Sequence, residues 1–128
     1  MAKYVTIKTV VEGLDGTGQA LPNRVVETQY LINEIVYLTL TIPNNGSKTF
    51  CVEGTNVSGI TDPIVVGLTA ITGYRVESTQ QLSVKEDGAA LAVTRGPGVQ
   101  LVENANLNTL QLSNTSGSAA SVKVEIWG

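Results

Sequence analysis

Apolar and polar residues alternate along most of the chain. The pattern is clear in EIVYLTLTIP (residues 34–43) and again in SVKVEIW (residues 121–127). Successive side chains of a strand leave opposite faces of a sheet, so a period of two predicts half-buried β-strands. The positions predicted to face a core are Val36, Leu38, Leu40, Val122, Val124 and Ile126.

Shorter strand candidates fill the rest of the chain, and turn sequences separate them. PNNGS, KEDG and GPG supply Asn, Asp and Gly residues that accept positive φ, while SNTSGSAAS is predicted to be the loop of a final hairpin. Together they predict roughly nine to eleven short strands. The best helical candidate is VETQYLINE (residues 26–34), which its β-branched neighbours weaken.

The absence of a predicted helix layer determines the fold class. A sheet with one apolar face must bury that face, and here the available cover is a second sheet. A chain of 128 residues is long enough to enclose one core. We therefore predict an all-β protein, a single-domain antiparallel β-sandwich that spans residues 1–128.

Charge argues against two classes of partner. The sequence has 8 Lys and Arg against 11 Asp and Glu, a net charge of −3, with no cluster of cations. Nucleic-acid backbones and anionic membranes are bound by clustered cations, so we expect neither partner. The N-terminal segment lacks the apolar core of a signal peptide, and no stretch has the length of a membrane span. We expect synthesis and assembly in a cytoplasm.

The sequence offers little for catalysis. It has no histidine and one cysteine, Cys51, which we interpret as a small buried residue. We expect no catalytic residue, cofactor or metal site, although a carboxylate pair of the kind used in glycoside hydrolysis stays open. The segment LDGTGQ (residues 14–19) lacks the Lys of a P-loop and the acidic ladder of an EF-hand. A flexible turn is the favoured reading there, and Asp15 as a lone calcium ligand has no support.

Five residues are candidates for contact with a subunit or partner. Lys123 and Glu125 share a strand face and form either an ordinary surface pair or a subunit-facing salt bridge, of which we favour the first. Trp127 lies on the same face and either covers the edge of the sandwich or contacts a neighbour. Tyr37 and Tyr4, both on predicted outer faces, are candidates for an aromatic platform.

One resemblance bears on function. The closing segment NLNTLQLSNTSGSAASVKVEIWG resembles the final hairpin of head decoration (cement) proteins of tailed bacteriophages and of some fibre-associated β-sandwich domains. The upstream segment VYLTLTIPNNGSKTFCVEG is of the same style. The resemblance implies a jelly-roll-like sandwich and a virion component, often trimeric, on the capsid exterior at junctions between major capsid proteins. It transfers no functional residue.

These observations leave three classes of function in order. The first is a capsid decoration protein, not an enzyme, whose partners are the major capsid protein and further copies of itself in a homotrimer. The second is a fibre-associated or receptor-binding module that recognises a cell-surface glycan. The third is a carbohydrate-acting enzyme.

Overall fold

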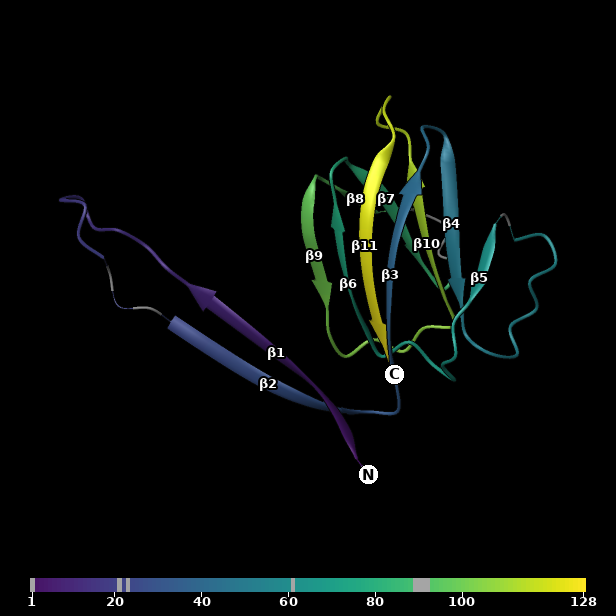
Figure 1. Cartoon of the computed structure of the whole chain (residues 1–128), viewed down its shortest axis with the longest axis horizontal. Coiled ribbons are helices and arrows are strands. Elements are labelled where there is room, and N and C mark those ends of the chain that lie inside the picture. The colour runs from purple at the N-terminus through teal and green to yellow at the C-terminus, as the bar shows by residue number, and fades with distance from the viewer. Residues whose placement is uncertain (1, 21, 23, 61, 89–92) are drawn as a thin grey trace. The chain divides into compact units, whose positions relative to one another are not determined.

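A computed structural model describes residues 2–20, 22, 24–60, 62–88 and 93–128 (Figure 1). These residues form eleven β-strands and no helix, so the all-β prediction is confirmed. The chain divides into two compact units, Met1–Asn33 and Glu34–Gly128. Among the described residues no helix has the length and apolarity that a membrane crossing requires.

The first unit is a β-hairpin. Strand β1 (Lys3–Val11) pairs antiparallel with β2 (Arg24–Ile32) over its whole length. The weak helical candidate at residues 26–34 belongs to β2 as far as Ile32. The predicted sandwich therefore occupies Glu34–Gly128 and not the whole chain. Alternation shows that a segment is a strand, but it does not show which partner the strand has.

The second unit contains two packed sheets (Figure 1). The four-stranded sheet is antiparallel throughout, in the order β3 (Ile35–Ile42), β11 (Ala120–Trp127), β6 (Gly73–Ser78), β9 (Gly98–Val102). The five-stranded sheet has the order β5 (Pro63–Val65), β4 (Gly46–Cys51), β10 (Thr109–Asn114), β7 (Leu82–Glu86), β8 (Val93–Arg95). The short strand β5 runs parallel to β4, which departs from the predicted antiparallel arrangement.

The core lies between these sheets and is largely aliphatic. Val122, Val124 and Ile126 of β11 are at most 1% exposed, as their alternation predicted. Val36, Leu38 and Leu40 pack against the same core but stay partly exposed, because β3 ends its sheet. The six predicted inward positions are confirmed. The sheets also contribute Ile42, Phe50, Tyr74, Val76, Leu82, Val84, Leu110 and Leu112.

The predicted final hairpin is wrong in one respect. Strands β10 and β11 are consecutive, yet β10 pairs with β4 and β7 while β11 pairs with β3 and β6. The small-residue loop is therefore an arch between the two sheets. The buried Asn114 holds it, because its Nδ2 donates to Ile42 O (2.9 Å) and to Ser118 O (2.7 Å) while its Oδ1 accepts from Ser116 N (3.0 Å).

The turns between paired strands follow the predicted chemistry. Asn45, between β3 and β4, has φ 63°. Asp87 and Gly88, after β7, have φ 50° and 65°. These values lie in the left-handed region that Asn, Asp and Gly tolerate best.

Candidate interaction surface

The outer face of the four-stranded sheet gathers most of the predicted contact residues. Tyr37, Lys123, Glu125 and Trp127 all lie on the face opposite the core, since their neighbours along each strand point inward. Tyr4 lies on the hairpin unit, where its side chain is 58% exposed. We refer to the outer face of β3, β11, β6 and β9 as the outer sheet face.

The strand register arranges this face in rows. One row crosses the sheet as Tyr37, Glu125, Arg75 and Leu101. The next row crosses as Thr39, Lys123, Glu77 and Val99. Charged residues therefore occupy the central strands, while the exposed hydrophobic residues Tyr37, Val99 and Leu101 lie on the two edge strands.

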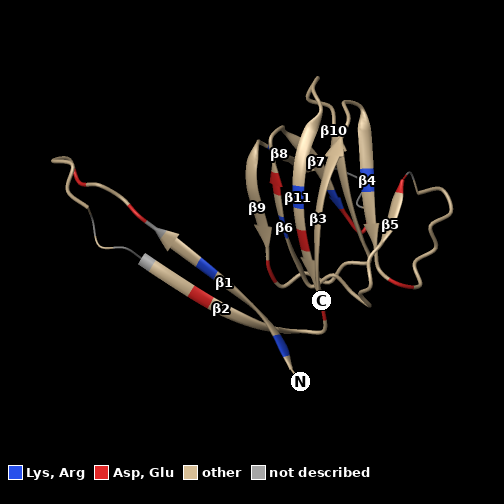
Figure 2. Cartoon of the chain, viewed as in Figure 1, with Lys and Arg blue, Asp and Glu red and all other residues tan. Residues whose placement is uncertain are grey.

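Arg75 organises the charges of the outer sheet face. Its guanidinium lies 3.6 Å from a Glu125 oxygen and 3.7 Å from a Glu77 oxygen. Figure 2 shows these charges on the adjacent strands β6 and β11. Glu125 pairs with Arg75 because directly opposite positions on neighbouring strands are closer than positions two residues apart on one strand. The described residues contain no ion pair between Lys123 and Glu125, so neither predicted form of that pair is present.

A shallow hollow of about 240 Å3 lies at one end of the outer sheet face. Lys123 and Glu77 line it together with the hydroxyl residues Thr39, Thr79 and Ser121. Tyr37 occupies the neighbouring position to Thr39 on the same face of β3. Hydroxyls, one cation and one carboxylate give this hollow hydrogen-bonding groups of both kinds.

Trp127 covers the end of the same face. Its side chain is 2% exposed, and its ring lies over Gly73, where an added Cβ would come within 2.3 Å of the indole. The backbone N–H of Thr72 donates to Trp127 O at 2.8 Å. Within one chain the indole therefore has the covering role that the sequence left open, and little of its area is left for a neighbour.

A polar link joins the two sheets inside the sandwich. The hydroxyl of the buried Tyr74 donates to a Glu86 oxygen at 2.5 Å, and Gln100 Nε2 donates to the same hydroxyl at 3.4 Å. Burial, assisted by the Glu86 carboxylate, raises the pKa of Tyr74, so the phenol stays a neutral donor. This link connects β6, β7 and β9.

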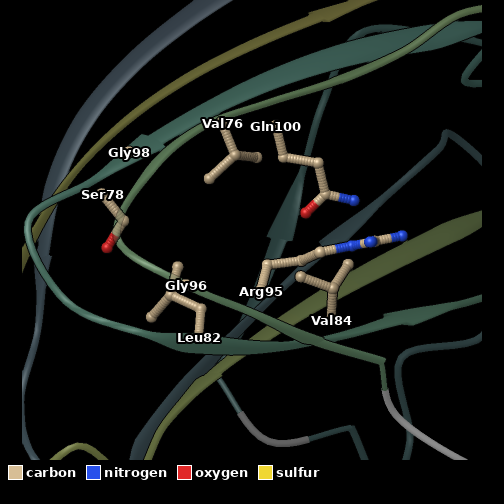
Figure 3. Close-up of a pocket in the computed structure, with 8 residues that line it drawn as sticks. All are labelled: Val76, Ser78, Leu82, Val84, Arg95, Gly96, Gly98 and Gln100. Atoms are coloured by element: carbon tan, nitrogen blue, oxygen red, sulfur yellow. The ribbon is translucent and has the colours of Figure 1, made fainter.

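A small cavity lies next to this link (Figure 3). Its volume is about 10 Å3, and its lining includes Val76, Leu82, Val84, Arg95 and Gln100. That volume is no larger than about one water molecule needs. The cavity therefore belongs to the packing between the sheets and does not accommodate a substrate.

The remaining candidates for chemistry have structural roles. Cys51 is fully buried, as predicted, and burial raises the pKa of its thiol. Asp15 Oδ1 accepts hydrogen bonds from Thr17 N (2.8 Å), Thr17 Oγ1 (2.6 Å) and Gln19 N (3.0 Å), so it organises its own loop. In the described part of the chain no three His, Cys, Asp or Glu side chains are grouped as a metal site would require.

Sequence reasoning missed Arg75 and Asn114. Arg75 had a detectable signal, because YRVES alternates and places Arg75 and Glu77 on one face. The role of Asn114 had none, since its carbonyl partner Ile42 O is 72 positions away in sequence.

No protein-family model matches this chain, and no curated protein matches its sequence. The arguments below rest on the fold, the outer sheet face and the hairpin.

Proposed function

We propose that the protein is a structural virion component, a decoration protein that binds the outside of a phage capsid as a homotrimer and stabilises it. The observation that carries the proposal is the outer sheet face. Exposed Tyr37, Val99 and Leu101 flank a central cluster of paired charges on a rigid four-stranded sheet. Aromatic and aliphatic groups beside polar ones are typical of a protein–protein contact surface. We propose no catalytic activity.

The strand order supports a capsid-related fold. We interpret the orders β3-β11-β6-β9 and β4-β10-β7-β8 as those of an eight-stranded jelly roll with β5 added at one edge. Two Greek keys of this kind build viral capsid and lectin domains. Because one fold serves many functions, the order supports the class of protein, while the surface supports the role.

Stabilising a capsid requires binding and no chemistry. Each copy would contribute one modest contact area, and linking several copies multiplies weak contacts through effective concentration. The acidic net charge of −3 suits a position outside the shell, away from packaged DNA.

The test is co-sedimentation with empty shells assembled from the major capsid protein encoded by the same genome. We expect the wild type to sediment with the shells and Tyr37→Ala to bind at least about tenfold more weakly, as for the loss of a central aromatic contact. Val65→Ala is the matched control, because Val65 is 58% exposed on the five-stranded sheet and Tyr37 is 66% exposed. Wild type that stays in the supernatant at every concentration would refute the proposal.

A second candidate function rests on the hollow beside Tyr37. Hydroxyl groups, Lys123 and a nearby aromatic ring are the groups that a glycan-binding site uses, so the alternative is a fibre-associated or receptor-binding module. A glycan array separates the two functions. Binding that Lys123→Ala abolishes, together with no binding to shells, would favour the glycan module.

A further inference from the structure

The edge of β3 is open along its whole length. In the described residues, β11 is its one strand neighbour. Glu34 and Gly128 exchange two backbone hydrogen bonds, of 3.0 and 3.1 Å. Hydrogen-bonded and non-bonded pairs alternate along an antiparallel ladder. It follows that Tyr37, Thr39 and Thr41 turn their N–H and C=O groups away from β11, toward the open edge.

This edge lacks the features that usually prevent pairing. The eight residues of β3, IVYLTLTI, include no charge and no proline. Its inward side chains Val36, Leu38 and Leu40 are only partly buried. Natural edge strands are protected by charges, prolines, bulges or short length, and an unprotected long edge is a site for adding a strand.

The hairpin unit is incomplete in the complementary way. Its two strands are nine residues long, and each has one edge without a strand partner. The hydrophobic residues Tyr4, Val25, Val26 and Leu31 are 51–69% exposed. A two-stranded hairpin alone is marginally stable in water, and a third strand or a packed face is what stabilises it.

The hairpin matches the β3 edge in length and in pattern. One face carries Val5, Ile7 and Tyr30, which would continue the inward row of β3. The other face carries the opposed pair Lys8 and Glu27, which would continue the polar outer face without an unbalanced charge. Nine-residue strands cover an eight-residue edge completely.

The chain between β2 and β3 favours a hairpin from another copy. Asn33 and Glu34 alone connect the two strands. A two-residue loop closes a β-hairpin through residues with positive φ, and neither Asn33 nor Glu34 has a positive φ. The connection is therefore no hairpin turn, and β2 does not pair with the β3 that follows it.

We propose that the hairpin of one copy adds to the β3 edge of a second copy, extending its four-stranded sheet to six strands. The contact is heterologous, since hairpin meets edge, so successive copies close into a ring or extend as a chain. This inference concerns self-association alone, and it stands or fails independently of a capsid or glycan partner.

Cross-linking between marked copies tests the pairing directly. Two full-length variants, Thr6→Cys and Tyr37→Cys, are co-expressed with different tags and treated with a short bismaleimide. Thr6 lies beside Gln29 across the hairpin (3.4 Å), so the reagent reaches from whichever strand adds to the edge. We expect mixed Thr6–Tyr37 dimers in excess over like-with-like dimers. The wild type is the control, because its only cysteine, Cys51, is buried.

Other cross-linking patterns would overturn the proposal. A Thr6→Cys/Tyr37→Cys double variant that links mainly within one chain would show that the hairpin folds onto its own β3. Links between two Thr6 positions alone would show hairpin–hairpin contact. No link at high protein concentration would show that β3 stays open or meets a different partner.

A proline at the edge supplies a second test. Thr39→Pro removes an N–H that points to the open edge and leaves the ladder to β11 intact. We expect it to weaken self-association at least about tenfold in sedimentation velocity, the value of one backbone hydrogen bond. Thr39→Val keeps the N–H and should associate like the wild type. Equal association of folded Thr39→Pro, or a wild type that stays monomeric, would contradict the inference.

Discussion

The hairpin and the sandwich have the same sequence pattern but opposite burial. Strands β1 and β11 both alternate, and both pair along their full length. Yet Val122, Val124 and Ile126 of β11 are at most 1% exposed, whereas Val25 and Leu31 of the hairpin are 51% and 69% exposed. Alternation produces a strand in each case, but a core forms only where a second sheet covers the apolar face.

This difference separates two sources of stability within one chain. Burial of apolar area stabilises the sandwich unit, at roughly 25 cal/mol for each Å2 removed from water. The hairpin unit has cross-strand pairs, such as Lys8 beside Glu27, whose contributions are each below about 1 kcal/mol. The hairpin should therefore depend on what it pairs with.

Amide hydrogen exchange should show the largest contrast between the two units. At low protein concentration, amides of β1 and β2 should exchange at least about a thousandfold faster than those of β11, because local opening costs little where few apolar contacts are lost. Mass spectrometry of peptic fragments measures both regions in one sample.

Protein concentration sharpens this contrast. If the hairpin adds to the β3 edge of another copy, its exchange should slow as concentration rises, while exchange in β11 should change little. Hairpin amides as protected as those of β11 at every dilution would show that the hairpin is stabilised within one chain.

Replacing an aromatic residue in each unit should give the next largest difference. Trp127→Ala should lower the free energy of unfolding by about 3 to 5 kcal/mol, because a buried indole leaves a cavity over Gly73. Tyr4→Ala, at a side chain 58% exposed, should change it by less than about 0.5 kcal/mol. Urea unfolding followed by circular dichroism gives both values. A small loss for Trp127→Ala would return that residue to a contact role.

Removing the side chain that holds the arch should have a smaller effect. Asn114→Ala should cost about 2 kcal/mol, since it leaves the buried carbonyl of Ile42 and the groups of Ser116 and Ser118 without their partner. Asn56→Ala is the matched control, because Asn56 accepts one hydrogen bond, from Ser58 N, at an exposed turn. Equal losses in thermal or urea unfolding would show that the arch is held by other contacts.

The local part of the fold was predictable, and the long-range part was not. The faces of β3 and β11 and the positive φ of Asn45, Asp87 and Gly88 depend on neighbouring residues, so the sequence contains them. Whether β10 meets β11 depends on β4 and β7 also competing for it, and alternation does not encode that choice. The final pair of strands was therefore assigned to one sheet when it belongs to two.

The same distinction applies to the candidate surface. Lys123, Glu125 and Tyr37 share a face by their spacing within strands, and this grouping was predictable. The partner of Glu125 is Arg75, which lies 50 positions earlier and becomes its neighbour only through the pairing of β6 with β11. Contacts across strands need the register, which one sequence does not contain.

The smallest predicted effect concerns acid and the hairpin loop. The Thr17 hydroxyl, followed by the backbone N–H groups of Thr17 and Gln19, holds the pKa of Asp15 below its ordinary value of 3.8. A carboxyl with a lowered pKa favours the folded loop when ionised. Its contribution is therefore present above pH 3.8 and is lost as the pH falls through the folded pKa.

An acid titration followed by NMR measures this effect at the residues involved. The amide signals of Thr17 and Gln19 should move together, with a midpoint below 3.8, while amides of the sandwich stay still over the same step. Asp15→Asn keeps an acceptor oxygen but does not titrate, so its loop amides should lose the step. A midpoint at or above 3.8 would mean that the three hydrogen bonds do not persist in solution. Loss of the step in sandwich amides too would mean that the loop and the sandwich unfold together, which would join the two units that burial separates.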